Sequence, residues 1–478
     1  MSEHPNEFAP ESHEPLPTGW RVPVALLLLA LPIIASMISR TVMSFVDFIM
    51  VSQLGTEAQA AIMPAGILLF CFVAFGMGSL TAVSTFVSQS LGRNDRQACG
   101  SYAWQGVHLS VLLGLLALPV WFVVPGLFAW VGHDPAVQEM EVAYVQIGLL
   151  GLAPMLAAHA VTNFFNGIHK PMVGFWAMVI SNIFNVIANY ALIFGNFGFP
   201  AMGIGGAAWA TNLAAGLQLL IMLAWMLRPK LAAMFDTRHT WRPDLARMRR
   251  IIWVGVPAGM QFVVDIFAFT VFTLLLVGRF GTVQLAAHNL AFKFLEVAFM
   301  PAVGLGVAVT AAVGKAIGRG QPAYARLVTR WAAGFAIAYM GLIAMGYLLL
   351  RHELAGLLSD DPDVIRWAGQ LLLLCAVFQV FDGLGITHIS ALRGAGDNHW
   401  PAWVAAIMAA TVLIGGGYVA AWWWPQLGAV GPWIAATLYV CVLGLTLWAR
   451  WTFGPWERID LFNDEQTQAD APHEHIDP

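Results

Sequence analysis

Four carboxylic acids interrupt the long apolar stretches of this sequence: Asp47, Asp265, Glu296 and Asp382. A charge at the centre of a bilayer costs roughly 2.5–3.5 kcal/mol on insertion scales, so an acid in such a stretch needs a partner or a function. A buried carboxylate is stable while it holds a proton, a sodium ion or an organic cation, and it is costly when bare. These acids therefore predict cation exchange inside a membrane.

The four acids differ in their neighbours. Asp265 has no basic residue within four positions on either side, which argues against a local ion pair. Asp382 is followed by Gly383 and Gly385, and glycine beside a buried carboxylate permits close backbone approach or bending. Asp47 lies near one end of its apolar stretch, where it could instead cap a helix or lie at the membrane interface. We assign Asp265 and Asp382 to function and keep Asp47 as a candidate.

Two basic residues accompany the acids and are possible accessory residues of the same site, together with Glu296. Lys293 precedes Glu296 by three positions, so the two can meet on one helix face and neutralise each other. Arg40 precedes Asp47 by seven positions, which is two helical turns along one face. Arg40 could neutralise Asp47 or reach an acid in the other half of the chain.

Three asparagines, Asn182, Asn185 and Asn189, form one helical stripe at positions i, i+3 and i+7. Hydrogen bonds between helices would explain the stripe. Amide oxygens near a carboxylate would also suit a bare monovalent cation, because hard cations prefer oxygen ligands. The histidines and the four cysteines show no spacing typical of a metal site, so we expect no bound metal and no cofactor.

The composition indicates which elements hold these residues. The chain has 478 residues, of which 59% are hydrophobic and 10% charged, whereas a soluble domain has about 25% charged residues. A helix needs about 20 apolar residues to cross a bilayer, and no segment alternates as a barrel strand does. We therefore predict an all-α integral membrane protein with twelve transmembrane helices, near residues 24–50, 60–88, 103–130, 140–165, 172–197, 203–227, 251–278, 285–315, 327–350, 364–392, 402–424 and 428–449.

Basic residues gather in the loops that follow even-numbered spans, among them Arg93, Lys170, Arg319, Arg393 and the basic stretch 228–250. The loops after odd-numbered spans hold only Arg279, Arg351 and Arg366. The positive-inside rule then places both termini in the cytoplasm. We expect an N-terminal tail (1–22), an N-terminal lobe (23–227), a cytoplasmic linker (228–250), a C-terminal lobe (251–450) and a C-terminal tail (451–478).

The two halves repeat. A shift of 226 residues lays Gly55-Thr56 on Gly281-Thr282, and Gly92-Arg93 on Gly318-Arg319. Because six spans is an even number, both halves cross the membrane in the same direction. This predicts two pseudo-symmetric six-helix lobes about an axis along the membrane normal, with the site between them near the midplane.

The acids do not follow the repeat. The same shift sets Asp47 against Thr273 and Asp265 against Ser39. The lobes therefore hold two unlike candidate sites, one with Asp47 and one with Asp265 and Asp382.

Three motifs resemble the MATE (multidrug and toxic compound extrusion) exporters, and specifically their NorM-like branch. They are VDFIMVSQLGT at position 46, LAAHNLAF at position 285 and SALRGAGD at position 390, and the resemblance covers residues 20–450. For the first lobe, the resemblance implies that Asp47 is the aspartate of span 1. It further implies that Asn185, Asn189 and Thr211 are the polar residues around it.

For the second lobe, the resemblance implies that Asp382 is the aspartate of span 10 and that Asp265 replaces an acid of span 7 that is usually glutamate. A tyrosine often found one turn before the span 10 aspartate is Phe378 here, which removes one oxygen. Arg40 and Lys293 are further departures from the family pattern. Extra fixed cations would disfavour sodium and favour proton coupling.

The expected function is secondary active multidrug efflux, in which H⁺ or Na⁺ is exchanged for cationic amphiphilic small molecules by alternating access. We expect a transporter and not an enzyme, a monomer in the bacterial inner membrane that contacts lipids and no nucleic acid. One alternative is a lipid-linked oligosaccharide flippase of a related superfamily, whose cleft should be rich in Arg and Lys. The other is an integral-membrane enzyme with clustered carboxylates, for which the sequence offers only Asp360, Asp361 and Asp363.

Overall fold

The computed structural model describes residues 16–462, and these residues form helices and connecting turns without a strand. Residues 1–15 and 463–478, which make up most of the two expected tails, lie outside the described part. The helices are α1 (Arg21–Ser52), α2 (Thr56–Gly92), α3 (Arg96–Ala117), α4 (Val120–Val131), α5 (Pro135–Leu150), α6 (Leu152–Gly167), α7 (Pro171–Phe194), α8 (Gly203–Met226), α9 (Pro229–Phe235), α10 (Leu245–Val271), α11 (Thr282–Gly318), α12 (Pro322–Gly356), α13 (Pro362–Ala395), α14 (His399–Met408), α15 (Gly417–Trp423) and α16 (Val430–Phe453).

The number of membrane spans agrees with the prediction. In the described part, ten helical segments are each long and apolar enough to cross a membrane, and two further pairs, α3 with α4 and α5 with α6, qualify together. Each of these pairs bends by 48°, and counting each as one span gives twelve. The prediction of an all-α membrane protein is confirmed.

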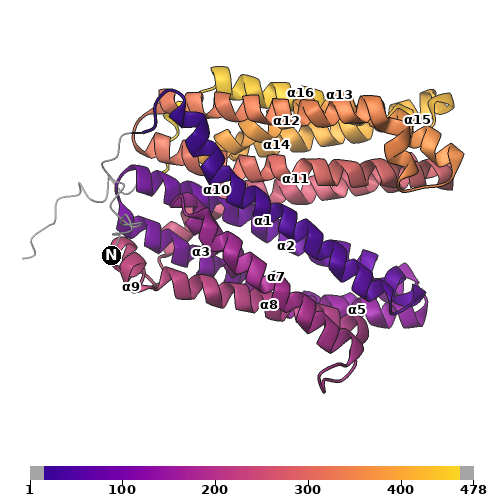
Figure 1. Cartoon of the computed structure of the whole chain (residues 1–478), viewed down its shortest axis with the longest axis horizontal. Coiled ribbons are helices and arrows are strands. Elements are labelled where there is room, and N and C mark those ends of the chain that lie inside the picture. Colours follow the sequence, from indigo (N-terminus) through magenta and orange to yellow (C-terminus); the bar gives the residue numbers. More distant parts are fainter. Residues whose placement is uncertain (1–15, 463–478) are drawn as a thin grey trace, which may run out of the picture.

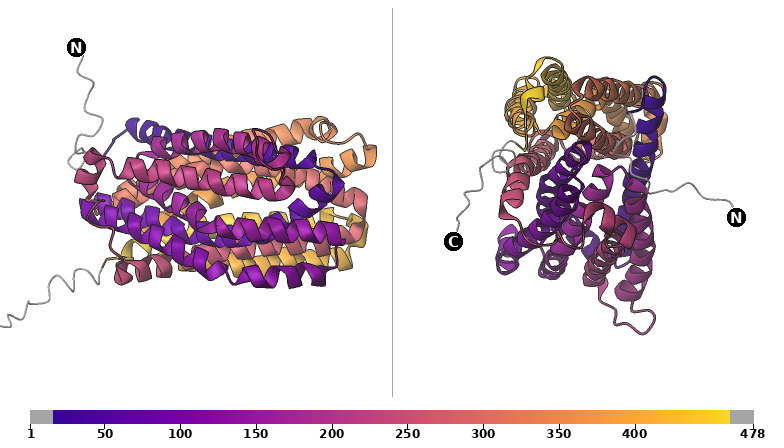
Figure 2. Two further views of the ribbon diagram at one scale, coloured as in Figure 1. Left: turned by 90° about the horizontal axis from the view of Figure 1, so that it is seen from below. Right: turned by 90° about the vertical axis from the view of Figure 1, so that its left-hand side faces the viewer.

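The helices form two lobes that lie side by side (Figure 1). The first lobe contains α1 to α8, and the second contains α10 to α16. The end-on view in Figure 2 separates the purple and magenta helices of the first lobe from the orange and yellow helices of the second. The connecting stretch between the lobes contains the short helix α9, and α10 begins at Leu245.

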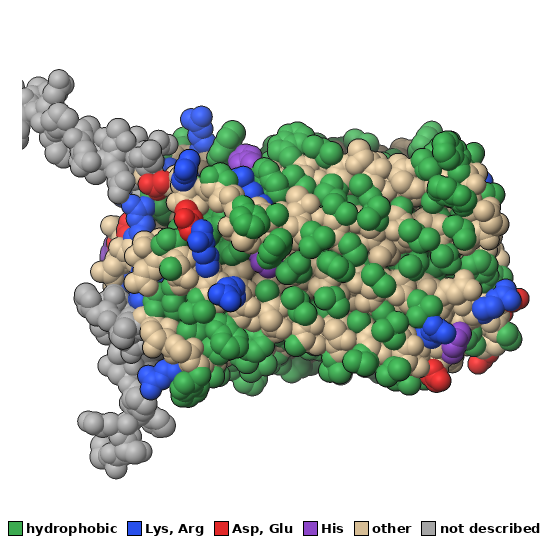
Figure 3. Space-filling view, turned by 90° about the horizontal axis from the view of Figure 1, so that it is seen from above, with side chains coloured by type: hydrophobic (Ala, Val, Ile, Leu, Met, Phe, Trp, Pro, Cys, Tyr) green, Lys and Arg blue, Asp and Glu red, His purple; other side chains and the backbone are tan. Residues whose placement is uncertain are grey.

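The start of α1 and the end of α16 lie at the same end of the bundle (Figure 1). We call this end, where α2 and α11 also finish, the basic end, and the opposite one the far end. Figure 3 shows hydrophobic side chains over the middle of the molecule and most of the visible Lys and Arg side chains toward the basic end. This distribution is typical of a protein whose middle is covered by lipid.

The two lobes touch through glycines in the halves of α2, α10 and α11 nearest the basic end. A Cβ atom added to Gly92 would lie 2.3 Å from the carbonyl oxygen of Lys315, and one added to Gly255 would lie 2.0 Å from that of Ser79. Hydrogen bonds join the same surfaces, because Gln89 Nε2 donates to the carbonyl oxygen of Gly394 at 2.9 Å. The lobes are therefore closely packed toward the basic end, where a side chain larger than hydrogen would separate the helices.

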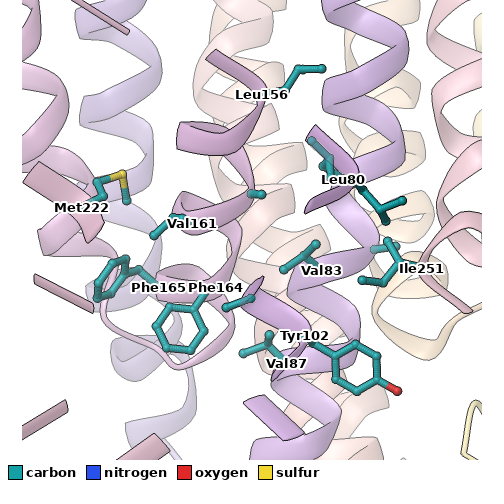
Figure 4. Packing of buried hydrophobic residues seen from close by; sticks show 14 of the residues in the cluster. Leu80, Val83, Val87, Tyr102, Leu156, Val161, Phe164, Phe165, Met222 and Ile251 are labelled. Atoms are coloured by element: carbon teal, nitrogen blue, oxygen red, sulfur yellow. The ribbon is translucent and has the colours of Figure 1, made fainter. Parts of the chain in front are cut away.

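The first helix of each lobe packs into the opposite lobe near the basic end. Val22, Leu26 and Ile33 of α1 belong to a buried cluster with residues of α11, α12, α13 and α16. Ile251 and Val254 of α10 belong to the core of the first lobe. Figure 4 shows Ile251 beside the α2 side chains of that core. Near the basic end, each lobe therefore buries part of the first helix of the other lobe, and we call α1 and α10 the exchanged first helices.

After α16 the chain turns back across the basic end as a segment that we call the C-terminal strap, residues 454–462. Its start is held by the second lobe. Trp456 stacks on Trp451 with ring centroids 3.9 Å apart, and its indole nitrogen donates to the carbonyl oxygen of Trp451 at 2.6 Å. Glu457 forms an ion pair of 2.9 Å with Arg326 of α12.

The end of the C-terminal strap is held by the first lobe. The Phe462 ring is 3% exposed and lies edge-on to Phe86 and Tyr102, with centroid distances of 5.9 Å and 6.1 Å. The Arg93 guanidinium lies 4.4 Å from the centre of the same ring. The strap therefore joins the two lobes across the basic end, with an aromatic ring buried in the first lobe.

Candidate functional site

The first candidate site lies between α1 and α7. Asn189 of α7 donates its Nδ2 to Asp47 Oδ1 of α1 at 2.5 Å and to Asn185 Oδ1 at 2.8 Å. The side-chain oxygen of Asn189 is buried and has no hydrogen-bond partner among the described residues. Buried polar atoms are rarely left unpaired, so this oxygen next to a carboxylate marks a position where a cation or a donor would be stabilised.

The other polar residues considered for this site form hydrogen bonds with groups other than Asp47. Asn182 donates to Ser39 Oγ of α1 at 2.8 Å, which is the interhelical hydrogen bond that the asparagine stripe also allowed. The hydroxyl of Thr211 donates to the carbonyl oxygen of Ala207 in its own helix at 3.0 Å. The structure therefore brings Asn185 and Asn189 to Asp47, while the hydroxyl of Thr211 is hydrogen-bonded within its own helix.

Tyr144 of α5 is a residue that sequence reasoning missed. It lies close enough to Asp47 for the carboxylate charge to act on its hydroxyl. No motif in the sequence distinguishes this tyrosine from the apolar residues around it.

The second candidate site lies in the second lobe, between α10, α13 and α16. The hydroxyl of Tyr439 on α16 donates to Asp265 Oδ1 on α10 over a long distance of 3.4 Å. The charges of both Asp265 and Asp382 reach this hydroxyl, so the three side chains form one cluster. The two acids that we assigned to function thus both lie in the second lobe, on α10 and α13.

Tyr439 supplies a phenolic oxygen that the sequence comparison with the family did not place. The family's usual tyrosine position is Phe378, whose ring stacks on Trp433 with centroids 6.4 Å apart. Tyr439 comes from α16, 57 positions after Asp382 (439 − 382), in a stretch without any recognised motif. Only the fold reveals that this hydroxyl faces the acids.

Arg393 corrects another expectation. We counted it among the loop cations, but α13 continues to Ala395 and Arg393 lies within this helix. Its Nη2 donates to Gln261 Oε1 at 3.1 Å, one turn before Asp265 on α10, and the guanidinium charge acts on Asp265. Thr85 of the first lobe donates to the backbone oxygen of Arg393 at 2.9 Å, so this residue is bonded both to the helix that carries Asp265 and to the first lobe.

The three possible accessory residues, Lys293, Glu296 and Arg40, lie in different surroundings. Lys293 pairs with Glu296 at 3.0 Å, with the two side chains 74% and 48% exposed, so they neutralise each other at an exposed position. Arg40 lies among α1, α2 and α6, with Nη2 3.7 Å from the sulfur of Met77. It forms no ion pair with an acid of the described part.

The position equivalent to Asp47 in the second lobe holds a neutral pair. The indole N–H of Trp433 donates to His288 Nδ1 at 3.1 Å, and His288 Nε2 lies 2.9 Å from the hydroxyl of Thr273. An indole N–H can only donate, so His288 Nδ1 must accept and Nε2 carries the proton. Thr273, the counterpart of Asp47 in the repeat, is thus bound to a neutral histidine, and the two lobes differ in charge at this place.

A histidine at the basic end lies in the contact between the lobes. His169, in the turn between α6 and α7, has its Nε2 3.3 Å from the carbonyl oxygen of Ala311 in α11. Burial, and after it the nearby charge of Lys315, lowers the pKa of His169 to about 3. The lobe contact therefore requires the neutral imidazole.

This contact predicts a pH dependence. Once the lobes separate and His169 meets water, its pKa returns to about 6.5, so stabilisation by the contact is complete above this pH and is lost as the pH falls below it. From pH 7.5 to pH 5.5 we expect the closed basic end to lose about 1.4 kcal/mol, roughly tenfold in population. Distances between spin labels at Met172 and Ala323, on the basic ends of α7 and α12, measure the shift. The wild-type protein and His169→Gln should differ by this amount, and equal pH responses would contradict the prediction.

Comparison with known proteins adds three findings. The MatE family model matches residues 32–191 and 257–419. The chain is 32% identical to "Probable multidrug resistance protein NorM" of Rhizobium meliloti, covering 93% of this chain and 95% of that protein. It is 31% identical to "Multidrug resistance protein PmpM" of Pseudomonas aeruginosa, covering 80% and 81%.

Solved structures share the fold. A structure titled "Outward-facing conformation of a multidrug resistance MATE family transporter of the MOP superfamily" matches with a TM-score of 0.83 and 20% identity over 92% of this chain and 97% of that one. The eukaryotic MATE transporter AtDTX14 matches with a TM-score of 0.82 and 18% identity over 94% of this chain and 99% of that one.

In the described part, no group of three or more His, Cys, Asp or Glu residues could hold a metal ion.

Proposed function

Because this chain belongs to the MATE family and is a NorM-like multidrug efflux transporter, we propose that it exports cationic amphiphilic small molecules in exchange for protons or sodium ions. Membership of a transporter family removes the membrane-enzyme alternative. It also disfavours the oligosaccharide flippase, which belongs to a different branch of the related superfamily. The observation that carries the proposal is the pair of unlike carboxylate sites, one in each lobe.

The carboxylate sites support exchange because no Lys or Arg of the described part forms an ion pair with their carboxylate oxygens. In the first lobe, Asp47 lies beside the unpaired oxygen of Asn189. In the second, the hydroxyl of Tyr439 donates to Asp265, and the charge of Asp382 also acts on this hydroxyl. A proton, a small cation or an organic cation that enters either site relieves a costly buried charge, and its departure requires a replacement.

We propose protons as the coupling ion in the second lobe. The guanidinium of Arg393 acts on Asp265, and a sodium ion placed there would meet the repulsion of this fixed charge. A proton binds covalently to one carboxylate oxygen and adds no separate charge centre beside the guanidinium. Asp382, which has no basic residue within hydrogen-bonding distance in the described part, remains the group in this lobe best suited to take it up.

Alternating access follows from the arrangement of the lobes. We propose that the basic end faces the cytoplasm, in accordance with its many Lys and Arg residues, and that both termini lie on that side. The close glycine contacts then hold the cytoplasmic side shut, and the lobes rock about their interface to open it. The expected setting is the bacterial inner membrane, with the monomer surrounded by lipid.

A vesicle assay tests the proposal. Purified protein is reconstituted into proteoliposomes, and efflux of the fluorescent cation rhodamine 123 is followed while a proton gradient and a sodium gradient are imposed separately. We expect the proton gradient to drive efflux at least about tenfold faster than the same vesicles without a gradient. Efflux driven by sodium alone would overturn the proposed ion. Efflux that responds to neither gradient would overturn exchange itself.

A further inference from the structure

The end of α13 takes part in the closed contact between the lobes at the basic end. The carbonyl oxygen of Arg393 accepts a hydrogen bond from the hydroxyl of Thr85 at 2.9 Å, and that of Gly394 accepts one from Gln89 Nε2 at 2.9 Å. Thr85 and Gln89 belong to α2 of the first lobe, one turn apart. Opening of the basic end therefore has to separate the backbone around Arg393 from α2.

The side chain of Arg393 extends from this contact to α10. Its Nη2 donates to Gln261 Oε1 at 3.1 Å, and its guanidinium carbon lies 5.3 Å from the centre of the Phe262 ring. Phe262 in turn packs against α2, because a Cβ atom added to Gly78 would lie 2.6 Å from Phe262 Cδ2. The partly buried guanidinium thus lies at the junction of α2, α10 and α13, between the two lobes.

Asp265 supplies negative charge to this cation. It lies one turn after Gln261 on α10, and the carboxylate and guanidinium charges act on each other. The amide oxygen of Gln261 accepts a hydrogen bond but carries no net charge, so a neutral Asp265 leaves the guanidinium without this compensation. A buried charge that loses its counterion is costly, and water that enters between separated helices removes the cost.

We propose that Arg393 is a positioning residue that holds the basic end closed while Asp265 is charged and favours opening once Asp265 is neutralised. This inference rests on the proposed function and adds to it the link between the acid cluster and the lobe contact. A proton or an organic cation at Asp265 cancels the negative charge, and separation of α13 from α2 then hydrates the guanidinium. A transporter whose Asp265 is bare stays closed at the basic end, which prevents a change of conformation without a bound cation.

A double-mutant cycle tests the inference in the absence of any transported molecule. Asp265→Asn imitates the neutralised acid, and distances between spin labels at Met172 and Ala323 give the ratio of open to closed basic ends. We expect Asp265→Asn to raise this ratio about tenfold or more when Arg393 is present. In the Arg393→Gln protein the same substitution should change the ratio by less than about twofold, because no cation remains to lose its counterion.

Two further variants separate charge from packing. Arg393→Lys keeps the charge and should restore most of the response to Asp265→Asn. Arg393→Met fills similar space without a charge and takes the place of Arg393→Gln if the glutamine variant does not fold. The matched control is Asp382→Asn, because Asp382 belongs to the same acid cluster while the acid whose charge acts on Arg393 is Asp265. This control should change the ratio by the same factor with and without Arg393.

The inference is overturned if Asp265→Asn shifts the ratio equally with and without Arg393, or if it leaves the ratio of the otherwise unchanged protein as it was. A response that Arg393→Lys does not restore also overturns it, because the charge is then not what links the acid to the contact. The proposed function is judged separately by efflux of rhodamine 123 from vesicles. Gradient-driven efflux together with a failed cycle removes the role of Arg393 alone, and absence of efflux removes the proposed function whatever the cycle shows.

Discussion

Replacing Asp382 with asparagine is expected to reduce gradient-driven efflux of rhodamine 123 to the level of protein-free vesicles. Asparagine has almost the same shape, so the packing of α13 should be retained. An amide, however, neither binds nor releases a proton near neutral pH, and it offers no charge to a cation. Initial rates of efflux under an imposed proton gradient measure the effect.

The matched control for this substitution is Asp363→Asn. Asp363 lies on the first turn of the same helix, where its side chain is 63% exposed and pairs with Arg366 at 3.1 Å. An exposed pair contributes about 0–1 kcal/mol, so this variant should transport at close to the wild-type rate. Full transport by Asp382→Asn would show that the acid cluster of the second lobe does not couple efflux to the gradient. Efflux by Asp47→Asn, measured in the same way, would then test whether the acid of the first lobe couples efflux to the gradient.

Removing the Phe462 ring is expected to have the largest effect on conformation. Truncation of a buried phenylalanine to alanine costs about 3–5 kcal/mol. Here the ring lies in the core of the first lobe, while Trp456 and Glu457 of the same C-terminal strap are held by the second lobe. Phe462→Ala should therefore loosen the link between the lobes and shift the population toward a separated basic end. Spin-label distances between Met172 and Ala323 report this shift, and thermal unfolding reports the loss of stability.

Phe453→Ala provides the control, because this side chain at the end of α16 is 78% exposed and its loss removes little buried area. Its label distances should match those of the wild type. If Phe462→Ala lowers the melting temperature but leaves the distances unchanged, the ring stabilises the first lobe without restraining the two lobes against each other. The melting temperature and the label distances together therefore show whether Phe462 only stabilises the first lobe or also restrains the two lobes against each other.

The features that the sequence predicted are those that a membrane imposes on any chain. Span length follows from bilayer thickness, and the cost of a buried charge singled out Asp47, Asp265 and Asp382. The repeat was visible because turn glycines such as Gly55 and Gly281 require backbone angles that other residues rarely adopt, with φ of 111° and 93°. These constraints act locally or at fixed spacing, so one sequence is enough to detect them.

The features that the sequence did not predict depend on how each helix is rotated about its axis. In a membrane both the lipid-facing side and the buried side are apolar, so the hydrophobic pattern contains little information about rotation. The contact of Tyr439 with Asp265 depends on packing between α10 and α16, and Arg393 faces α10 because α13 extends past its predicted end. The packing of Phe462 against the first lobe was not predicted for another reason. The neighbouring residues in the sequence are polar, and this composition is typical of a tail.

The exchanged first helices set the order in which the molecule can be assembled. As the chain is synthesised, the half of α1 nearest the basic end emerges without its neighbours, because the helices that bury Val22, Leu26 and Ile33 are made only with the second lobe. The first lobe in turn lacks Ile251 until α10 is complete, and it lacks Phe462 until the strap has left the ribosome. Neither lobe can therefore finish folding before the other, and the membrane-inserted first half must wait as an incomplete intermediate for the last residues of the described chain.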